Sequence, residues 1–128
     1  MYAPILEIDT KKVTENAKKL HDFCAQRGVE LTFVTKGFSA RPEVIRAALA
    51  GGITSFADSR LKNIRAAKQA IPGLKYLLIR IPAIMEAEDV VRWADWSLQS
   101  QIEVIKAVSE AALRQGKIHP IILMIDVG

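Results

Sequence analysis

The stretch that decides the fold runs from Glu30 to Val44 and reads ELTFVTKGFSARPEV. Its first half, LTFVTK, is an apolar run that predicts a buried strand ending on Lys36. Gly37 follows directly, and Pro42 stands where a helix would begin, in a first-turn position that does not need its missing N–H. A strand therefore leads into a helix through a turn that carries an amine, and the rest of the chain must show whether that amine has a function.

The same alternation of strand and helix continues along the whole sequence. Apolar runs predict strands at residues 4–9, 31–36, 54–58, 75–81, 96–100 and 120–128. Amphipathic patterns predict helices at residues 10–27, 42–50, 59–70 and 86–94, and a last helix that Ser100 opens and Gly116 ends. Glu103 stands three residues after Ser100, which predicts a capping box. Strands and helices that alternate in this way specify an α/β fold with a parallel sheet.

Two architectures fit this pattern. A doubly wound, flavodoxin-like domain has about this length, whereas a TIM-type (β/α)8 barrel needs about 250 residues, so the chain would supply only its first part. The end of the sequence favours the barrel, because no helix follows to cover the apolar strand predicted at 120–128. We therefore expect residues 1–128 to be the N-terminal portion of a barrel domain whose remainder lies outside this sequence.

The composition predicts a soluble cytoplasmic protein. Hydrophobic residues make up 50% and charged residues 25% of the 128 positions, which argues against disorder. No apolar run approaches the roughly 20 residues of a membrane span, and no leader pattern opens the chain. The single cysteine, Cys24, fits a reducing compartment. The net charge of +4 comes from basic residues spread along helices, which does not predict a nucleic-acid partner.

Polar residues gather where the predicted strands end. The carboxyl ends of parallel strands carry the active site in α/β folds. The residues expected at this rim are Lys36, Asp58, Ser59, Arg60, Arg80, Gln99, Ser100 and Asp126. Several also have a structural explanation, since Asp58 or Ser59 can cap the next helix and Asp126 can cap a helix beyond the sequence. Taken together, these residues predict a pocket.

Lys36 is the candidate nucleophile of this pocket. A lysine attacks carbonyl groups when its amine is neutral, and a partly desolvated rim beside Arg60 or Arg80 would lower the pKa of that amine. Other catalytic systems do not fit, because the sequence has no nucleotide-binding glycine motif and no serine elbow. His21 falls inside a predicted helix and His119 precedes a predicted strand, so both are expected to be structural or exposed, and no metal site is expected.

Several longer motifs resemble those of one enzyme family. EIDTKKVTEN at residues 7–16, VTKGFSA at 34–40, ADSR at 57–60, RIP at 80–82 and IDVG at 125–128 resemble the N-terminal part of the alanine racemase superfamily. They are most similar to the ornithine racemase-like branch of the amino-acid racemases that depend on pyridoxal 5'-phosphate (PLP). The resemblance covers essentially the whole chain. It implies that Lys36 forms the Schiff base with PLP.

The resemblance implies an isomerase that racemises a free amino acid, either an ornithine-like one or alanine. Asp58, Ser59, Arg60, Arg80 and Asp126 would be contacts to the substrate or to neighbouring groups. The two open edges of a partial barrel lead us to expect a homodimer or self-association.

The sequence departs from the family at one position. Alanine racemases carry an aromatic residue four positions after the lysine, where it contacts the cofactor phosphate, and this chain has Ala40 there. The family's main phosphate-binding loops and its opposing catalytic tyrosine would lie beyond Gly128. In the family the opening strand associates with a separate β domain. Residues 1–128 alone are therefore expected to be inactive.

Two functions of other classes stay open. One is a non-catalytic PLP-binding barrel with a carrier or regulatory role, although that class usually starts with a helix rather than with an EID strand. The other is a self-contained doubly wound module that binds a partner or a phosphate group without covalent chemistry.

Overall fold

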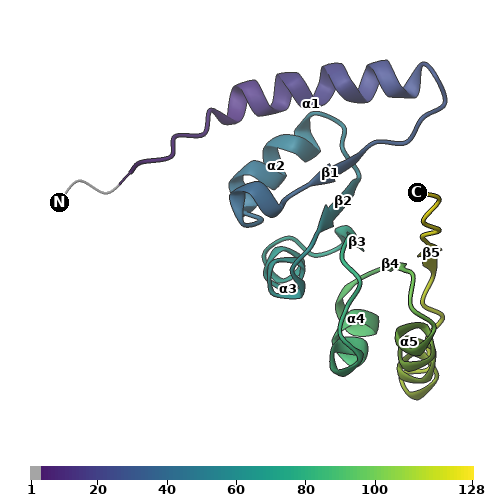
Figure 1. The fold of residues 1–128 in the computed structure, drawn as a ribbon. Helices are drawn as coiled ribbons and strands as arrows, with labels where there is room; N and C mark the ends of the chain where they lie inside the picture. The colour runs from purple at the N-terminus through teal and green to yellow at the C-terminus, as the bar shows by residue number, and fades with distance from the viewer. Residues whose placement is uncertain (1–3) are drawn as a thin grey trace.

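The structure is a computed structural model that describes residues 4–128 (Figure 1). Its centre is a five-stranded sheet in which all neighbouring strands run parallel. The strands are β1 (Thr32–Val34), β2 (Ser55–Asp58), β3 (Lys75–Leu78), β4 (Trp96–Gln99) and β5 (Ile121–Leu123). They lie side by side in the order in which they follow one another along the chain.

A helix connects each strand to the next. The helices are α1 (Thr10–Ala25), which precedes β1, followed by α2 (Pro42–Ala50), α3 (Leu61–Ala70), α4 (Ala87–Trp93) and α5 (Ile102–Arg114). Short 3-10 turns, η1 (Lys36–Phe38) and η2 (Ile84–Glu86), precede α2 and α4. Figure 1 shows α2 to α5 along one side of the sheet, with α1 packed against α2. Within residues 4–128, no helix covers the other side.

The strand order separates the two predicted architectures. A doubly wound domain reverses its strand order at a switch point and has helices on both faces of the sheet. Here the order β1-β2-β3-β4-β5 never reverses, and the helices lie on one face. This is the arrangement of strands and helices in a barrel. The fold is therefore the first part of a TIM-type barrel, and the doubly wound alternative is wrong.

The face of the sheet that meets the helices forms the core. Phe33, Phe56 and Tyr76 are aligned by the register of β1, β2 and β3, with ring centroids 6.2 Å apart for the first pair and 5.8 Å for the second. They pack with buried helix residues such as Ile45 and Ile64. Burial of these large side chains drives the sheet and the helices together.

The opposite face carries a second set of apolar side chains. Because side chains alternate along a strand, it consists of Val34, Ala57, Leu77, Trp96, Leu98 and Ile122. None of these belongs to the described core cluster, and Val34 and Ile122 are 44% and 45% exposed. We call this set the open face. In a closed barrel such a face lines the interior.

Most of the predicted elements are present, and the helix predicted at 42–50 is confirmed to the residue. Its boundaries follow from local chemistry, because Pro42 lies in the first turn and Gly51 caps the end. The strands are shorter than predicted. In β1 the reason is Thr35, whose ψ of −7° turns the backbone out of the extended conformation before Lys36.

Two local predictions are wrong. Residues 4–9 form no strand and extend away from the sheet (Figure 1), because within residues 4–128 no strand lies beside them to pair with their backbone. The capping box expected from Ser100 and Glu103 is also missing. α5 begins at Ile102, and its N-cap is Gln101, whose side chain makes no capping hydrogen bond.

Candidate active site

Lys36 lies at the edge of the sheet where three strands end. It follows β1 and is the first residue of η1. The amide of Thr35 donates to the carbonyl of Ala57 at 2.8 Å, and the amide of Ile79 donates to the carbonyl of Asp58 at 3.1 Å. These bonds continue the ladders past the ends of β1 and β3, so residues 35, 58 and 79 share one edge.

The side chain of Lys36 is exposed and has no partner among residues 4–128. Another lysine, Lys68, lies 2.8 Å from Asp95 in an ion pair. By contrast, no residue in the described range 4–128 forms a hydrogen bond or an ion pair with the side chain of Lys36. A primary amine therefore stands at the carboxyl edge of the sheet, and no interaction with the described part of the chain has to break before it reacts.

The backbone before and after Lys36 is held firmly. The carbonyl of Thr35 accepts hydrogen bonds from the amides of Phe38 at 3.3 Å and Ala40 at 3.1 Å. Ser39 and Ala40 both have positive φ, 54° and 52°, in the left-handed region that side chains other than glycine rarely adopt. Strained backbone of this kind persists only where the surroundings fix it, and it gathers at functional sites.

Asp58, the last residue of β2, is completely buried and contacts Thr35, the residue before this turn. Its carboxylate accepts hydrogen bonds from Thr35 Oγ1 at 2.7 Å, from the amide of Arg60 at 2.8 Å and from Asn63 Nδ2 at 3.2 Å to each oxygen. The prediction that it caps the next helix is wrong in detail, since α3 begins at Leu61 with Arg60 as its N-cap residue. Asp58 instead connects the end of β1 to the first turn of α3.

Of this network the sequence predicts only Asp58 as a rim residue, and Thr35, Asn63 and Tyr76 are found only in the structure. Asn63 looks like an ordinary residue of a helix, yet it is buried and bonded to Asp58. Tyr76 looks like a core aromatic residue, yet its hydroxyl donates to Thr35 Oγ1 at 3.4 Å. Burial raises the pKa of Tyr76 to about 12, and the nearby Asp58 acts in the same direction, so the phenol keeps its proton at neutral pH. A polar residue beside the lysine, Thr35, was the only signal in the sequence.

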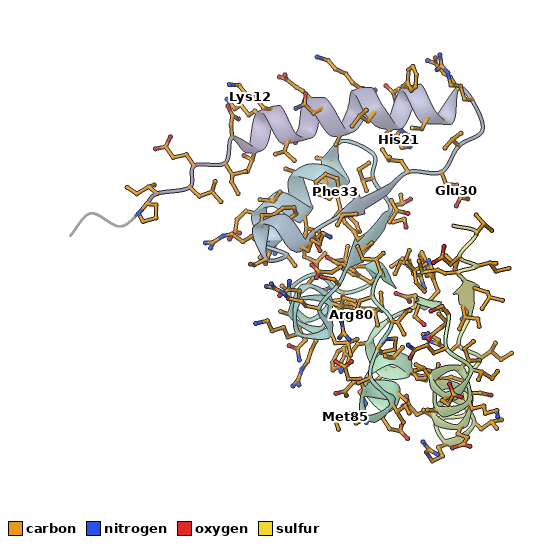
Figure 2. All side chains as sticks on the ribbon, in the orientation of Figure 1. Lys12, His21, Glu30, Phe33, Arg80 and Met85 are labelled. Carbon is orange, nitrogen blue, oxygen red and sulfur yellow. The ribbon has the colours of Figure 1, made fainter. Side chains whose placement is uncertain are left out.

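Arg80 also lies at this edge, but its guanidinium is fully engaged. Nε donates to the carbonyl of Ser59 at 2.9 Å, and Nη1 and Nη2 form a two-pronged ion pair with Glu86 at 2.9 and 2.8 Å. Hydrogen bonding to Glu86 raises the pKa of Arg80, and the same pair lowers the pKa of Glu86. Figure 2 shows Arg80 beside α3, where it joins the turn after β2 to the turn before α4.

The remaining rim residues are less closely associated with Lys36. Arg60 is exposed and Ser59 is half-buried. Gln99 is buried, and its Nε2 donates to Ser97 Oγ at 3.0 Å. Asp126 lies past the end of β5, where its Oδ1 accepts from the amide of Gly128 at 3.0 Å. The structure therefore gathers Asp58, Ser59 and Arg80 around the ends of β1 to β3, and it leaves Asp126 on an exposed segment.

The two histidines lie away from this edge. His119 precedes β5, and its Nε2 is 3.0 Å from Ser97 Oγ; burial lowers its pKa. His21 lies on the side of α1 that faces Gly52 (Figure 2), and it also lines a hollow of about 430 Å³ with Leu31 and Ser55, near the starts of β1 and β2. Both histidines therefore have the structural positions expected of them.

The described residues include neither a group of metal ligands nor a membrane-spanning helix. Within residues 4–128, no group of three or more His, Cys, Asp or Glu side chains is placed to hold a metal ion. None of the helices in that range is long and apolar enough to cross a membrane. What the edge offers chemically is a free primary amine on a fixed backbone, which suits covalent attachment of a carbonyl compound.

The sequence of this chain is similar to those of known proteins. The model of the family described as alanine racemase, N-terminal domain, matches residues 8–128. The chain is 34% identical over 125 residues to ornithine racemase of Acetoanaerobium sticklandii, which covers 98% of this chain and 35% of that protein. It is 32% identical over 128 residues to lysine racemase of Thermotoga maritima, covering 100% and 36%. The chain thus spans about a third of the length of these curated relatives.

Solved structures show the same fold. D-threonine aldolase of Filomicrobium marinum matches with a TM-score of 0.82 at 19% identity, over 99% of this chain and 35% of that one. Alanine racemase of Streptomyces coelicolor matches with 0.80 at 21%, over 94% and 33%. PipY of Synechococcus elongatus, solved with PLP bound, matches with 0.76 at 22%, over 88% and 55%. At these identities the likeness concerns the fold.

Proposed function

Because this chain belongs to the family of alanine racemase N-terminal domains, we propose that the whole protein is a PLP-dependent amino-acid racemase and that Lys36 holds the cofactor. The observation that carries this proposal is the position of Lys36. Its amine is exposed and has no partner within residues 4–128, and it stands on a fixed turn at the carboxyl edge of the barrel strands.

The residues around Lys36 fit covalent attachment of PLP. Lys36 Nζ would condense with the aldehyde carbon of the cofactor and release water. Ala40 is 3% exposed, so this position offers no side chain to a cofactor phosphate, and other groups would have to bind it. When bound, PLP would stabilise the negative charge that develops on the substrate after loss of its α-proton.

Lys36 would then act as a proton carrier. With the substrate in place, Lys36 Nζ would take the α-proton from one face of the substrate or return a proton to that face. Inversion also needs a carrier on the opposite face, and we propose that residues outside 4–128 supply it. The 128-residue chain alone would then be inactive.

We propose that the substrate is an amino acid with an amine on its side chain. The support comes from the names of the two curated relatives, ornithine racemase and lysine racemase. Within residues 4–128 two carboxylates that lie at this end of the sheet, those of Asp58 and Glu86, are already bound to other residues. The acidic group that recognises the second amine would therefore come from elsewhere in the protein.

The proposal extends to location and assembly. Cys24 is a free cysteine, which fits a cytoplasmic protein. β1 and β5 are the two edges of the sheet, and the residues of β5 are all exposed. Apolar edge strands pair with other chains, so we expect the 128-residue chain to form a homodimer or to self-associate in another way.

A second candidate function is PLP binding without racemisation. It is favoured by PipY, whose structure with PLP bound has the same fold and is shorter than the racemases, so that this chain covers 55% of it. Both candidates need Lys36 to hold the cofactor. They differ in whether the protein turns over a free amino acid.

The first experiment tests whether Lys36 holds the cofactor. The full-length protein is incubated with PLP and treated with borohydride, which makes the linkage permanent, and the labelled peptide is identified by mass spectrometry. We expect the label on Lys36, its loss in Lys36→Ala, and no change in Lys62→Ala, which removes an exposed lysine of α3. A label on another lysine would overturn the assignment.

The reaction is then measured with L-ornithine, L-lysine and L-alanine by chiral chromatography. We expect the D-enantiomer of ornithine or lysine to appear faster than that of alanine. A labelled Lys36 with no turnover of any amino acid would favour the binding protein instead.

A further inference from the structure

The hydrogen bonds of Thr35, Asp58, Asn63 and Tyr76 form a buried network next to Lys36. It links β1, β2, β3 and α3, which lie next to one another in Figure 1. We propose that Thr35, Asp58, Asn63 and Tyr76 are positioning residues, which hold the turn that carries Lys36 in the one conformation from which its amine meets the cofactor. This inference rests on the proposed function of Lys36.

The direction of the hydrogen bonds follows from the chemistry of the groups. Thr35 has one hydroxyl proton, and its 2.7 Å contact with the carboxylate of Asp58 is shorter than its 3.2 Å contact with the carbonyl of Ala57. The proton therefore goes to the carboxylate, since charge-assisted bonds are the stronger ones. The Tyr76 hydroxyl can then donate to Thr35 Oγ1, while Asn63 donates to Asp58 from the other side.

Every polar group of Thr35 is occupied. Its amide donates to Ala57, its carbonyl accepts from Phe38 and Ala40, and its hydroxyl is bonded to Asp58. Neither rotation of the Thr35 side chain nor a shift of its peptide plane is possible without breaking one of these bonds. Because Lys36 is the next residue, its Cα is fixed in the same way, and only its flexible side chain remains free to move.

The burial of Asp58 argues for a role beyond packing. It is 0% exposed, and within residues 4–128 no cation pairs with it. A buried carboxylate held by neutral donors is costly, and apolar residues in its place often give equal or greater stability. Fully satisfied buried networks, in return, select one conformation. The residue whose conformation this network selects is Thr35, next to the amine.

The same strand provides a matched control. At the start of β1, Thr32 Oγ1 lies 3.0 Å from Ser55 Oγ of β2. This is also a contact of a threonine hydroxyl with a side chain of β2, but it lies at the opposite end of β1 from Lys36. Thr32→Val and Thr35→Val therefore remove the same chemical group, one at the start of β1 and the other directly after its end.

The test uses the full-length protein with two measurements for each variant. The first is the rate of PLP attachment to Lys36, followed by borohydride trapping and mass spectrometry. The second is hydrogen exchange at the amides of Phe38 and Ala40, which donate to Thr35, relative to exchange in the rest of the barrel. A loss of global stability alone would speed exchange everywhere, whereas a positioning role predicts a local effect.

We expect Thr35→Val to slow attachment and to speed exchange at Phe38 and Ala40, each by about tenfold, as for the loss of one charge-assisted hydrogen bond. Thr35→Ser keeps the hydroxyl, so its rates of attachment and of exchange should match those of the unmodified protein. Thr32→Val should change neither rate. Tyr76→Phe and Asn63→Leu should act in the same direction. They decide the matter if Thr35→Val fails to fold.

The failures of the two proposals are distinguishable. If the unmodified protein carries no label on Lys36, the proposed function itself is wrong. If Lys36 is labelled but Thr35→Val, Tyr76→Phe and Asn63→Leu attach the cofactor as fast as the unmodified protein, with unchanged exchange at Phe38 and Ala40, the positioning inference alone is overturned.

Discussion

Gly51, at the end of α2, packs directly against Ala17 of α1. A Cβ atom at Gly51 would lie 2.6 Å from the Cβ of Ala17 and 2.7 Å from the carbonyl oxygen of Thr14. Thr14 strengthens the same contact, because its hydroxyl donates to the carbonyl of Ala47 at 3.0 Å. The first helix is thus held on the barrel by a glycine that lets two backbones approach closely.

Gly51→Ala should therefore destabilise the protein. The added methyl group would meet atoms of α1 that have no room to move, and overpacking of this kind costs about 1–3 kcal/mol. The measurement is the free energy of unfolding from urea denaturation. Gly37→Ala is the control, because nothing lies within 4 Å of a Cβ there, and we expect a change within about 0.5 kcal/mol. Equal effects of the two substitutions would contradict the close contact.

The raised pKa of Tyr76 leads us to predict that the folded protein loses stability at alkaline pH. Its pKa in the folded protein is raised from 10.0 to about 12. The unfolded chain therefore loses this proton at a lower pH than the folded protein, and stability that is present below pH 10 is lost between about pH 10 and 12. In Tyr76→Phe this fall should be smaller. Urea denaturation at several pH values measures it, and a tyrosine that ionises at its ordinary pKa would speak against the network.

For the ion pair of Arg80 and Glu86 we predict the opposite pH dependence, a loss of stability in acid. Hydrogen bonding to Arg80 lowers the pKa of Glu86 from 4.5, so its contribution to stability is present above that pH and is lost as the pH falls through the lowered value. Both side chains are partly exposed, and we expect the contribution to be about 1 kcal/mol or less.

Glu86→Gln is the matching substitution. The protein that carries it should be less stable than the unmodified protein at neutral pH. This difference in the free energy of unfolding should shrink in acid. An unchanged difference at pH values well below 4.5 would show that the ion pair is not its source.

Ser39 allows a test of the strained turn. It is exposed, with φ at 54° and ψ at 37°, a conformation that disfavours a side chain by roughly 1–2 kcal/mol. Ser39→Gly should relieve that strain and stabilise the protein by up to about 1 kcal/mol, after the larger backbone entropy of glycine is included. Ser39→Ala keeps a Cβ and should be close to neutral. Thermal unfolding of the three proteins decides the matter, and a destabilised Ser39→Gly would refute it.

The sequence predicts the fold well where local chemistry sets a boundary. Pro42 suits the start of α2 because it lacks an N–H, and Gly52, just past its end, has a φ of 96° that a residue without a side chain adopts readily, and neither property depends on distant residues. The apolar run at residues 4–9 fails as a strand for the converse reason. A strand needs a partner, and an apolar run carries no information about whether one is present.

Some residues of the candidate site can be predicted from the sequence, whereas others are found only in the structure. The sequence predicts Lys36 as a candidate because it ends an apolar run at the expected rim and because the motif around it resembles one family. Asn63 and Tyr76 are not recognisable, because their importance comes from the register of β1, β2 and β3 and from the packing of α3, which bring them to Asp58 and Thr35. Contacts between residues far apart in the chain can be found only in the folded structure.

The sequential strand order also bears on how the protein is made. Each strand after β1 pairs with the strand that was synthesised just before it. The contacts that build the sheet therefore join neighbouring segments of the chain, which keeps the loops that must close during folding short. As the chain leaves the ribosome, every new strand from β2 to β5 finds its partner already in place, so the order of synthesis and the order of assembly coincide.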